Sequence, residues 1–400
     1  MSKVLFFVTE DWFFASHFLP MAAAARAQGF EAVVATRVRN HRERLEAEGI
    51  RVIALDVERK SVSLLMGIRN LVSAFRIVRA ERPDIVHCIA LRPVIMGGIA
   101  TKLGAAGTPL VLAPTGLGLL WLEHGWGVRS LRALVRTVLG SWLRGRNTHY
   151  MFENRDDPGE FGLDPDGDEV TIVGGAGADA SEFPMVPEPP APPLKVAVVS
   201  RMIAPKGIAD AVEAVRRARA AGAAIELNLF GGLDPSNRRA LTADQLREWS
   251  REPGITWHGH TADVPGVWRE HHVALFLSHY REGVPRTLIE AAASARPIVT
   301  TNIPGCRDIV RDQETGFVVP PRDVEAAARA LVMLAADPAV RARMGAGANR
   351  HFHKHFTVAS VQRTVGELYR RLADGSHPRG LGLGNCQSRS MAVGMGLTKR

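Results

Sequence analysis

Residues Glu282 to Val310 read EGVPRTLIEAAASARPIVTTNIPGCRDIV, and this stretch decides the fold. A helix is expected to begin at Pro285, because proline has no N–H to leave unpaired at the first helical position and its φ is already set. Residues 287–293 favour helix, and the apolar run 297–301 predicts a buried strand that a Pro-Gly turn ends. The stretch therefore predicts a loop, a helix, a strand and a second loop.

Two carboxylates stand in this stretch, Glu282 before the helix and Glu290 within its first two turns. A helix N-terminus binds anions through its free N–H groups, so a phosphate can lie on the backbone at residues 286–288. The two acids can then bind hydroxyl groups on either side of it, an arrangement that suits a sugar nucleotide. Taken alone, the pattern fits equally well a surface helix whose acids only complement its dipole.

Strands and helices alternate on both sides of a proline-rich stretch. In the first half, apolar runs predict strands, with helices between most of them and a loop over residues 10–16; the strands cover residues 4–9, 32–36, 52–55, 85–88 and 110–113. In the second half, strands are expected over residues 195–200, 224–230, 255–258 and 274–278. This alternation predicts parallel βαβ units in open, doubly wound α/β sheets, which bind ligands at the carboxyl ends of their strands.

The proline-rich stretch SEFPMVPEPPAPP marks the domain boundary. Just before it, GGAGADA at residues 174–180 matches a dinucleotide-binding fingerprint, but that fingerprint requires a following helix. Prolines follow instead, which argues against a nicotinamide cofactor. The expected division is a first domain at residues 1–183, a linker at 184–193, a second domain at 194–356, a helix at 357–375 that crosses back to the first domain, and a disordered tail at 376–400.

The 400-residue chain has a net charge of +9 and three scattered cysteines. The charge suggests a polyanionic partner, but basic residues do not alternate with aromatic ones and no nucleic-acid-binding motif is present, which disfavours nucleic acid. The cysteines suit a reducing cytosol and form no zinc motif, so no metal is expected. Neither a signal peptide nor an apolar stretch of about 18 residues is visible. We expect a cytoplasmic protein, either soluble or peripheral on the inner face of the cytoplasmic membrane.

Residues 127–146 are both apolar and basic. Arg129, Arg132 and Arg136 share one helical face among leucines and valines. A basic amphipathic helix can lie on an anionic membrane surface. An ordinary surface helix with solvated arginines explains the same pattern, so both interpretations stay open.

A second charged loop, SRMIAPKG at residues 200–207, follows the first strand of the second half. Arg201 and Lys206 lie between a strand end and a helix, at the kind of position where doubly wound sheets bind ligands. Two cations there can neutralise a departing diphosphate without a metal ion. The loop and the paired glutamates together indicate a diphosphate-binding site.

The chain resembles the retaining glycosyltransferases of family 4, which have the GT-B fold. The resemblance rests on S-R-x-x-x-x-K-G, a strand that ends in Gly-Gly, and E-G-x-P-x-x-x-x-E. The phrases DWFFASHFLP, PDIVHCIALRPVIMGG, TGLG, MFENRDD, PGCRDIV and TGFVVPP make it most similar to the branch that acts on lipid-linked sugars in bacterial envelope polysaccharide assembly. The resemblance covers residues 3–372 and implies two doubly wound Rossmann-like domains that face each other across a cleft.

The resemblance implies a role for each matching residue. Arg201, Lys206 and Glu282 are the expected catalytic residues: the cations stabilise the leaving diphosphate, and Glu282 contacts the donor sugar. Glu290 is expected to hold the ribose, and the further donor contacts are Gly231, His258, Gly283, Thr287 and Leu288, the last two through N–H groups on the distal phosphate. The first domain is expected to bind the acceptor through Ser16, His17, His87, Thr115 and Gly116. A buried structural histidine is at least as good an explanation of His87.

The implied reaction transfers a hexosyl or N-acetylhexosaminyl group from a nucleoside-diphosphate sugar, expected to be UDP-linked. The implied acceptor is a lipid-linked glycan, on undecaprenyl diphosphate, or a polysaccharide. The anomeric configuration is retained, and neither a metal nor another cofactor is needed. Two alternatives stay open: a sugar-nucleotide epimerase of the same fold, and a non-catalytic protein that binds sugar nucleotides.

Overall fold

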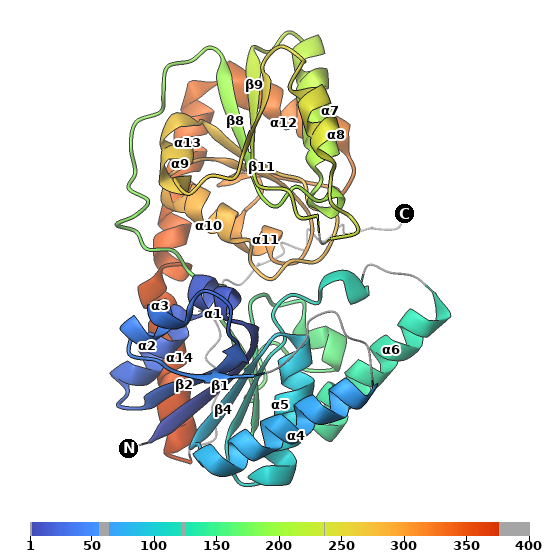
Figure 1. Ribbon diagram of the computed structural model, residues 1–400. Coiled ribbons are helices and arrows are strands. Elements are labelled where there is room, and N and C mark those ends of the chain that lie inside the picture. Colours follow the sequence, from blue (N-terminus) through green and yellow to red (C-terminus); the bar gives the residue numbers. More distant parts are fainter. Residues whose placement is uncertain (1, 56–63, 122–124, 236, 376–400) are drawn as a thin grey trace, which may run out of the picture.

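Two separate sheets, each made of parallel strands, form two stacked domains (Figure 1). The computed structural model describes residues 2–55, 64–121, 125–235 and 237–375, so the tail predicted at residues 376–400 lies outside the described residues. Helices cover both faces of each sheet, because strands buried on both faces need apolar cover on each side. The doubly wound α/β architecture predicted from the alternation is confirmed.

The N-terminal sheet has the strand order β3-β2-β1-β4-β5-β6-β7. The interior strand β1 is buried over Val4–Val8, an unbroken apolar run typical of a parallel strand covered on both faces. The elements of this domain are β1 (Lys3–Glu10), α1 (Asp11–His17), α2 (Leu19–Ala27), β2 (Glu31–Arg37), α3 (Arg42–Ala47), β3 (Arg51–Ala54), α4 (Leu64–Glu81), β4 (Ile85–Ile89), α5 (Leu91–Gly104), β5 (Leu110–Ala113), η1 (Gly118–Trp121), α6 (Trp126–Thr137), η2 (Val138–Trp142), β6 (Thr148–Phe152), η3 (Pro158–Phe161) and β7 (Val170–Ile172).

The C-terminal sheet has the strand order β10-β9-β8-β11-β12-β13. Strand order reverses between β8 and β11, and ligands bind doubly wound sheets at the carboxyl ends of such a pair. The elements are β8 (Leu194–Val199), η4 (Ala204–Lys206), α7 (Ile208–Ala220), β9 (Ile225–Phe230), α8 (Ala243–Trp249), β10 (Ile255–Gly259), α9 (Val264–Glu270), β11 (Val273–Phe276), α10 (Arg286–Ala293), β12 (Ile298–Thr301), α11 (Cys306–Ile309), β13 (Gly316–Val319), α12 (Val324–Ala336), α13 (Pro338–His355) and α14 (Val358–Ala373).

Three local expectations were wrong. Residues 10–16 were expected as a loop, but residue 10 ends β1 and the rest lie in α1, because the fully buried Asp11 carboxylate accepts N–H groups of Arg39 and His41 and fixes the chain there. Pro285 is the N-cap of α10 rather than its first residue, with an extended ψ of 119°. The helix expected over residues 127–146 ends as α6 at Thr137, and a π-helical segment, η2, follows it.

The last helix, α14, packs on the N-terminal domain, where Val361, Val365, Leu368 and Tyr369 join a core formed with β1 and β2. The chain thus crosses between the domains twice, once through residues 184–193 and once before α14 (Figure 1). The glycine-rich motif at residues 174–180 lies against the second crossing, where its backbone bonds to Phe356 and Val358. These glycines permit close backbone packing, and no helix follows them before β8.

Candidate active site

A cleft of about 730 Å³ lies between the domains at the carboxyl ends of both sheets. Residues from both domains line it: Thr9, Glu10, Trp12, Phe13, His17, Ala90, Arg92, Thr115, Gly116, Glu153, Val199, Ser200, Arg201, Lys206, Phe276, Tyr280, Arg281, Glu282, Gly283, Val284, Pro285, Arg286 and Thr287. Nearly all of them follow strand ends, as the topology of doubly wound sheets predicts. The cleft therefore brings together many, but not all, of the predicted site residues.

Lys206 and Glu282 meet in this cleft. Lys206 ends η4 after β8, and Glu282 lies in the loop after β11, so the reversal of strand order places them side by side. The Nζ of Lys206 lies 2.6 Å from Oε1 of Glu282, which also accepts the Ser278 hydroxyl at 3.0 Å. Burial by itself would lower the pKa of Lys206, but the charges of Glu282 and Tyr280 and the hydrogen bond to Glu282 together outweigh it and raise that pKa. The lysine is thus held as a cation on the cleft wall.

Arg201 also lines the cleft, and its side chain is 54% exposed. Its Nη1 lies 3.7 Å from Oδ2 of Asp234, a long pairing that leaves the guanidinium accessible. Gly231 directly follows β9 and lies against the loop that carries Arg201, but it does not line the cleft. A Cβ added there would lie 1.8 Å from the carbonyl oxygen of Ser200, so this position requires glycine to let the Arg201 loop approach.

The N-terminus of α10 carries a second group of polar residues. Arg286 and Thr287 line the cleft, and Nε of Arg286 donates to Oε1 of Glu290 at 2.8 Å. Burial raises the pKa of Glu290 to about 7, although the charge of Arg286 opposes this. The buried Leu288 packs in the core, and its N–H already donates to the carbonyl of Pro285. Of the two residues whose N–H groups were predicted to contact the distal phosphate, Thr287 lines the cleft and Leu288 does not.

His258 lies at the end of β10, exposed and outside the cleft wall. Its ring stacks on Phe230 with a centroid distance of 4.5 Å, and its Nε2 lies 2.7 Å from Oδ1 of Asn228. The two stacked rings are nearly parallel and form an aromatic platform beside the ends of β9 and β10. An aromatic platform there suits a nucleobase, which stacks on such faces.

His17, Thr115 and Gly116 from the N-terminal domain line the cleft, whereas Ser16 does not. The Ser16 hydroxyl bonds to Nδ1 of His17 at 2.6 Å, and the Ser16 carbonyl accepts Nη1 of Arg286 across the domain interface. Burial and the charge of Arg286 lower the pKa of His17 to about 4, so its imidazole is neutral at pH 7. The Thr115 hydroxyl is buried without a hydrogen-bond partner among the described residues.

His87 is not part of the cleft. Its ring, on β4, is fully buried, and Nδ1 lies 2.7 Å from the hydroxyl of Tyr369 on α14. Burial lowers the pKa of His87 to about 3, and the charge of His149 acts in the same direction. The geometry thus favours the structural interpretation of His87 over an acceptor contact.

The segment Glu153–Glu160, for which no role was predicted, lies against the loop that follows β11. Glu153 lines the cleft, and its Oε2 accepts the N–H of Val284 at 2.9 Å. Burial raises the pKa of Glu153 to about 7, and the charges of Asp157 and Glu282 add to this effect. A Cβ at Gly283 would lie 1.6 Å from that same Oε2, so close approach of Glu153 accounts for this glycine.

Two further properties concern metals and membranes. Within residues 2–55, 64–121, 125–235 and 237–375, no cluster of three or more histidine, cysteine or acidic side chains is arranged to hold a metal ion. In the same part of the chain, every helix is too short or too polar to cross a bilayer.

Two family models match the chain. Residues 193–337 match the model described as Glycosyl transferases group 1, and residues 3–139 match the one described as Glycosyl transferase 4-like. Together the matches cover more than half of the chain, one in each domain.

Curated relatives of the chain are also named as glycosyltransferases. The chain is 25% identical over 174 residues to the capsular polysaccharide biosynthesis glycosyltransferase CapM of Staphylococcus aureus, covering 44% of this chain and 45% of CapM. It is 22% identical over 303 residues to the UDP-Gal:alpha-D-GlcNAc-diphosphoundecaprenol alpha-1,3-galactosyltransferase of Escherichia coli, covering 70% and 73% of the two chains. The matches to CapM and to a glycogen synthase of Mycobacterium tuberculosis span about half the length of those relatives.

Solved structures share the fold. A glycosyltransferase from Rickettsia africae superposes with a TM-score of 0.74 at 17% identity, over 94% of this chain and 99% of the other. HepE from Anabaena, solved in complex with UDP and glucose, superposes with a TM-score of 0.70 at 16% identity, over 92% and 100%. These similarities establish the fold alone. With the two family models, they confirm the predicted resemblance: the chain belongs to the glycosyltransferases of family 4, with the GT-B fold.

Proposed function

We propose that this protein transfers a hexosyl or N-acetylhexosaminyl group from a UDP-sugar to a lipid-linked glycan, with retention at the anomeric carbon. The observation that carries the proposal is the Lys206–Glu282 pair, which lies with Arg201 on one wall of a cleft between two domains. Cations on that wall can stabilise a departing diphosphate, and Glu282 can orient hydroxyl groups of the sugar. On the other wall, His17 and Thr115 are available to the acceptor.

The donor part of the proposal draws on α10 and the platform at His258. Glu290, held by Arg286, suits the hydroxyls of a ribose, and the stacked rings of Phe230 and His258 suit a uracil base. HepE, which has the same fold, was solved with UDP and with UDP-glucose. No step of this scheme assigns chemistry to a metal ion.

The acceptor part draws on the relatives. The E. coli galactosyltransferase takes a diphosphoundecaprenol acceptor by its printed name, and CapM and WcaL are named for capsular polysaccharide and colanic acid biosynthesis. We therefore assign the protein to cell-envelope or exopolysaccharide synthesis, with undecaprenyl diphosphate as the lipid. Such an acceptor lies at the inner face of the cytoplasmic membrane, which implies peripheral contact with that membrane.

Product analysis tests this function. Purified protein is incubated with a panel of UDP-sugars and a membrane lipid extract, and lipid-linked products are identified by mass spectrometry. Transfer should fall at least about a hundredfold in Arg201→Ala, in line with the loss of one stabilising group for the leaving diphosphate. In Glu290→Ala it should fall as well, because the proposed contact with the ribose hydroxyls is lost. A changed sugar nucleotide formed without any acceptor would identify an epimerase instead. Binding of a UDP-sugar without any turnover would identify a non-catalytic protein.

A further inference from the structure

The phrase MFENRDD lies at the end of β6, and four of its side chains contact residues of the C-terminal domain. Glu153 accepts the N–H of Val284, and Nδ2 of Asn154 donates to the carbonyl of Glu282 at 3.1 Å. The carboxylates of Asp157 and Asp156 accept guanidinium N–H groups from two arginines of the C-terminal domain, Arg281 and Arg307 respectively. We name residues 153–160 the clasp and residues 281–284 the donor loop.

We propose that the clasp positions the donor loop, and that Asn154 and Arg281 are positioning residues through which domain closure sets the backbone of Glu282. This inference rests on the proposed function, because it assigns Glu282 to the donor sugar. It concerns how the site is assembled rather than which reaction it performs.

Asn154 is fully engaged in this arrangement. Its side chain is completely buried, its Oδ1 accepts the N–H groups of Asp156 and Asp157, and its Nδ2 donates both to Asp157 and to the carbonyl of Glu282. An amide with each of its groups committed admits one orientation only. The turn of the clasp and the backbone of Glu282 are therefore fixed to each other through one side chain.

Arg281 is held by two carboxylates of the clasp. Its Nη2 lies 2.8 Å from Oδ1 of Asp157, and its Nη1 lies 3.1 Å from Oε1 of Glu160. The Asp157 side chain is only 2% exposed, so this pair is screened far less than surface pairs are. A planar guanidinium fixes direction as well as distance when it bridges two acids.

Glu282 is thus positioned from both domains. Its carboxylate is held from the C-terminal domain by Lys206 and Ser278, whereas its carbonyl is held from the N-terminal domain by Asn154. If the domains move apart, the side-chain contacts can remain, but the backbone loses its fixed position. The set of contacts that positions Glu282 for the sugar is then complete only when the domains are closed.

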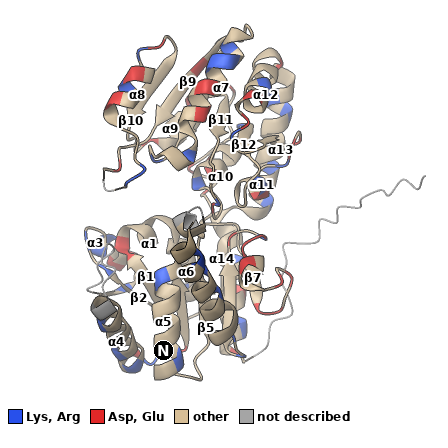
Figure 2. Ribbon diagram, turned by 90° about the vertical axis from the view of Figure 1, so that its right-hand side faces the viewer, with Lys and Arg blue, Asp and Glu red and all other residues tan. Residues whose placement is uncertain are grey.

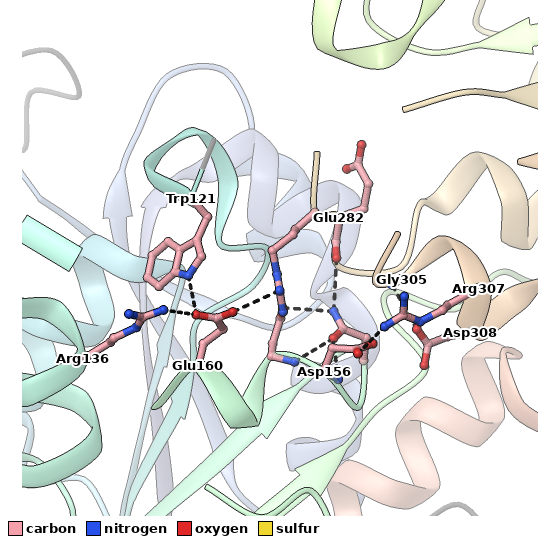
Figure 3. A network of polar contacts seen from close by, with 11 residues as sticks. Trp121, Arg136, Asp156, Glu160, Glu282, Gly305, Arg307 and Asp308 are labelled. Carbon is pink, nitrogen blue, oxygen red and sulfur yellow. Dashed lines mark hydrogen bonds and ion pairs between the residues drawn. The ribbon is translucent and has the colours of Figure 1, made fainter. Parts of the chain in front are cut away.

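The clasp also reaches the surface helix α6. Oε2 of Glu160 accepts Nε1 of Trp121 at 2.8 Å and bonds to Arg136 on α6, while its other oxygen bonds to Arg281 (Figure 3). Glu160 therefore joins the donor loop to the side of the N-terminal domain that carries α6.

Two variants and a matched control test the clasp. Asn154→Ala removes the donor to Glu282, and Asn154→Ser also removes the amide while its hydroxyl can still accept an N–H of the turn, which keeps the turn capped without adding a charge beside Asp157. The control is Arg155→Ala, next in sequence, because its exposed side chain pairs with Asp166 and does not reach the donor loop. Circular dichroism confirms that each variant is folded.

Hydrogen–deuterium exchange over residues 281–284 tests the contact without any ligand. Exchange should be about tenfold faster in both Asn154 variants, as expected for the loss of one buried hydrogen bond, and unchanged in Arg155→Ala. Unchanged exchange in the Asn154 variants would overturn the proposal, whatever reaction the protein performs.

Binding to UDP and to UDP-glucose, UDP-galactose and UDP-N-acetylglucosamine, measured by calorimetry, tests the positioning role. In Asn154→Ser and Arg281→Ala, affinity for the best-bound UDP-sugar should fall about tenfold, whereas affinity for UDP alone should change less than about twofold. Equal losses for UDP and UDP-sugar would show a general structural role and overturn the inference. If the wild-type protein bound none of these probes, the proposed donor would be wrong, and the exchange experiment would still decide about the clasp.

Discussion

The ammonium of Lys206 lies 2.6 Å from the carboxylate of Glu282, and each side chain is only 11% exposed. Removing one member of a buried pair leaves the other charge uncompensated, at a cost of about 3 kcal/mol or more. Lys206→Met should therefore lower the melting temperature as well as reduce sugar transfer at least about a hundredfold, since a cation on the diphosphate is lost. Calorimetry and a transfer assay measure the two effects.

The double variant Lys206→Met, Glu282→Leu separates these effects. Without either charge, no unpaired ion remains, so stability should return toward the wild-type value while transfer stays as low as in Lys206→Met. If the double variant regained transfer, neither residue would contact the donor. If it were less stable than both single variants, packing rather than charge would dominate at this site.

The contact between Gly283 and Glu153 predicts a non-additive pair. A methyl group at residue 283 would overlap Oε2 of Glu153 and push this carboxylate off the N–H of Val284. Gly283→Ala should thus reduce donor-sugar affinity about as much as Glu153→Ala does, and the double variant should be no worse than either one. Additive losses would mean that Gly283 serves the ligand directly and independently of Glu153.

Glu153 also predicts a pH dependence of stability. Its pKa is raised to about 7 by burial, from a usual 4.5, so the folded state holds the proton more tightly than the unfolded state. The resulting stabilisation is fully present below pH 4.5 and is lost as the pH rises toward 7. Relative to wild type, Glu153→Gln should become more stable over this range, by at most about 3 kcal/mol, because one pKa unit corresponds to about 1.4 kcal/mol.

Glu160→Gln is the control, because the pKa of Glu160 is shifted in the opposite direction to that of Glu153. Burial would raise the pKa of Glu160, but hydrogen bonds from Trp121 and Arg136 outweigh it and lower that pKa. Its stabilisation is present above the usual pKa and lost as the pH falls. Melting temperatures between pH 3 and 8 measure both effects. Glu153→Gln should gain on wild type as the pH rises from about 4.5 to 7, whereas Glu160→Gln should differ from wild type by a constant amount over that range and approach it only below pH 4.5. If the melting temperatures of Glu153→Gln and of wild type changed in parallel with pH, the raised pKa of Glu153 would be contradicted.

Tyr369→Phe tests the structural role of His87. The variant removes the only partner of Nδ1 among the described residues, and the other ring nitrogen, Nε2, is already buried without one. Stability should fall by about 1–3 kcal/mol, the cost of leaving a buried polar group unpaired. The KM for the acceptor should not change, because His87 lies outside the cleft. A raised acceptor KM in a folded variant would restore His87 as an acceptor contact.

The sequence predicted the sheets because parallel strands buried on both faces are apolar runs, as in Val4–Val8. It also indicated Lys206 and Glu282, since each follows such a run. Their contact joins residues 76 positions apart and depends on strand order, which periodicity does not encode. The clasp was missed for a similar reason: Asp157 and its neighbours look like a polar loop, and their burial becomes visible only when Arg281, 124 positions later, is placed beside them.

Membrane contact by α6 is a separate prediction, which the structure sharpens. The helix contains no acidic residue, and Figure 2 accordingly shows it only in blue and tan. Trp126 is 80% exposed and Leu134 60%, an apolar surface beside the exposed Arg129. Arg136 bonds to Glu160, so its reversal would also disturb the clasp. Arg129 has no ion-pair partner among the described residues and is the cleaner site to change.

Arg129→Glu should therefore weaken binding to phosphatidylglycerol vesicles about tenfold or more, since each basic residue near an anionic surface contributes about 1 kcal/mol and reversal adds repulsion. Trp126→Ala, as a separate variant, should also weaken vesicle binding, because it removes apolar surface from the membrane interface. Arg343→Glu is the matched control, because it makes the same change of net charge on an exposed position of α13, in the other domain. Co-sedimentation at low and high salt measures all three. Equal binding of Arg129→Glu and Arg343→Glu would leave α6 as an ordinary surface helix.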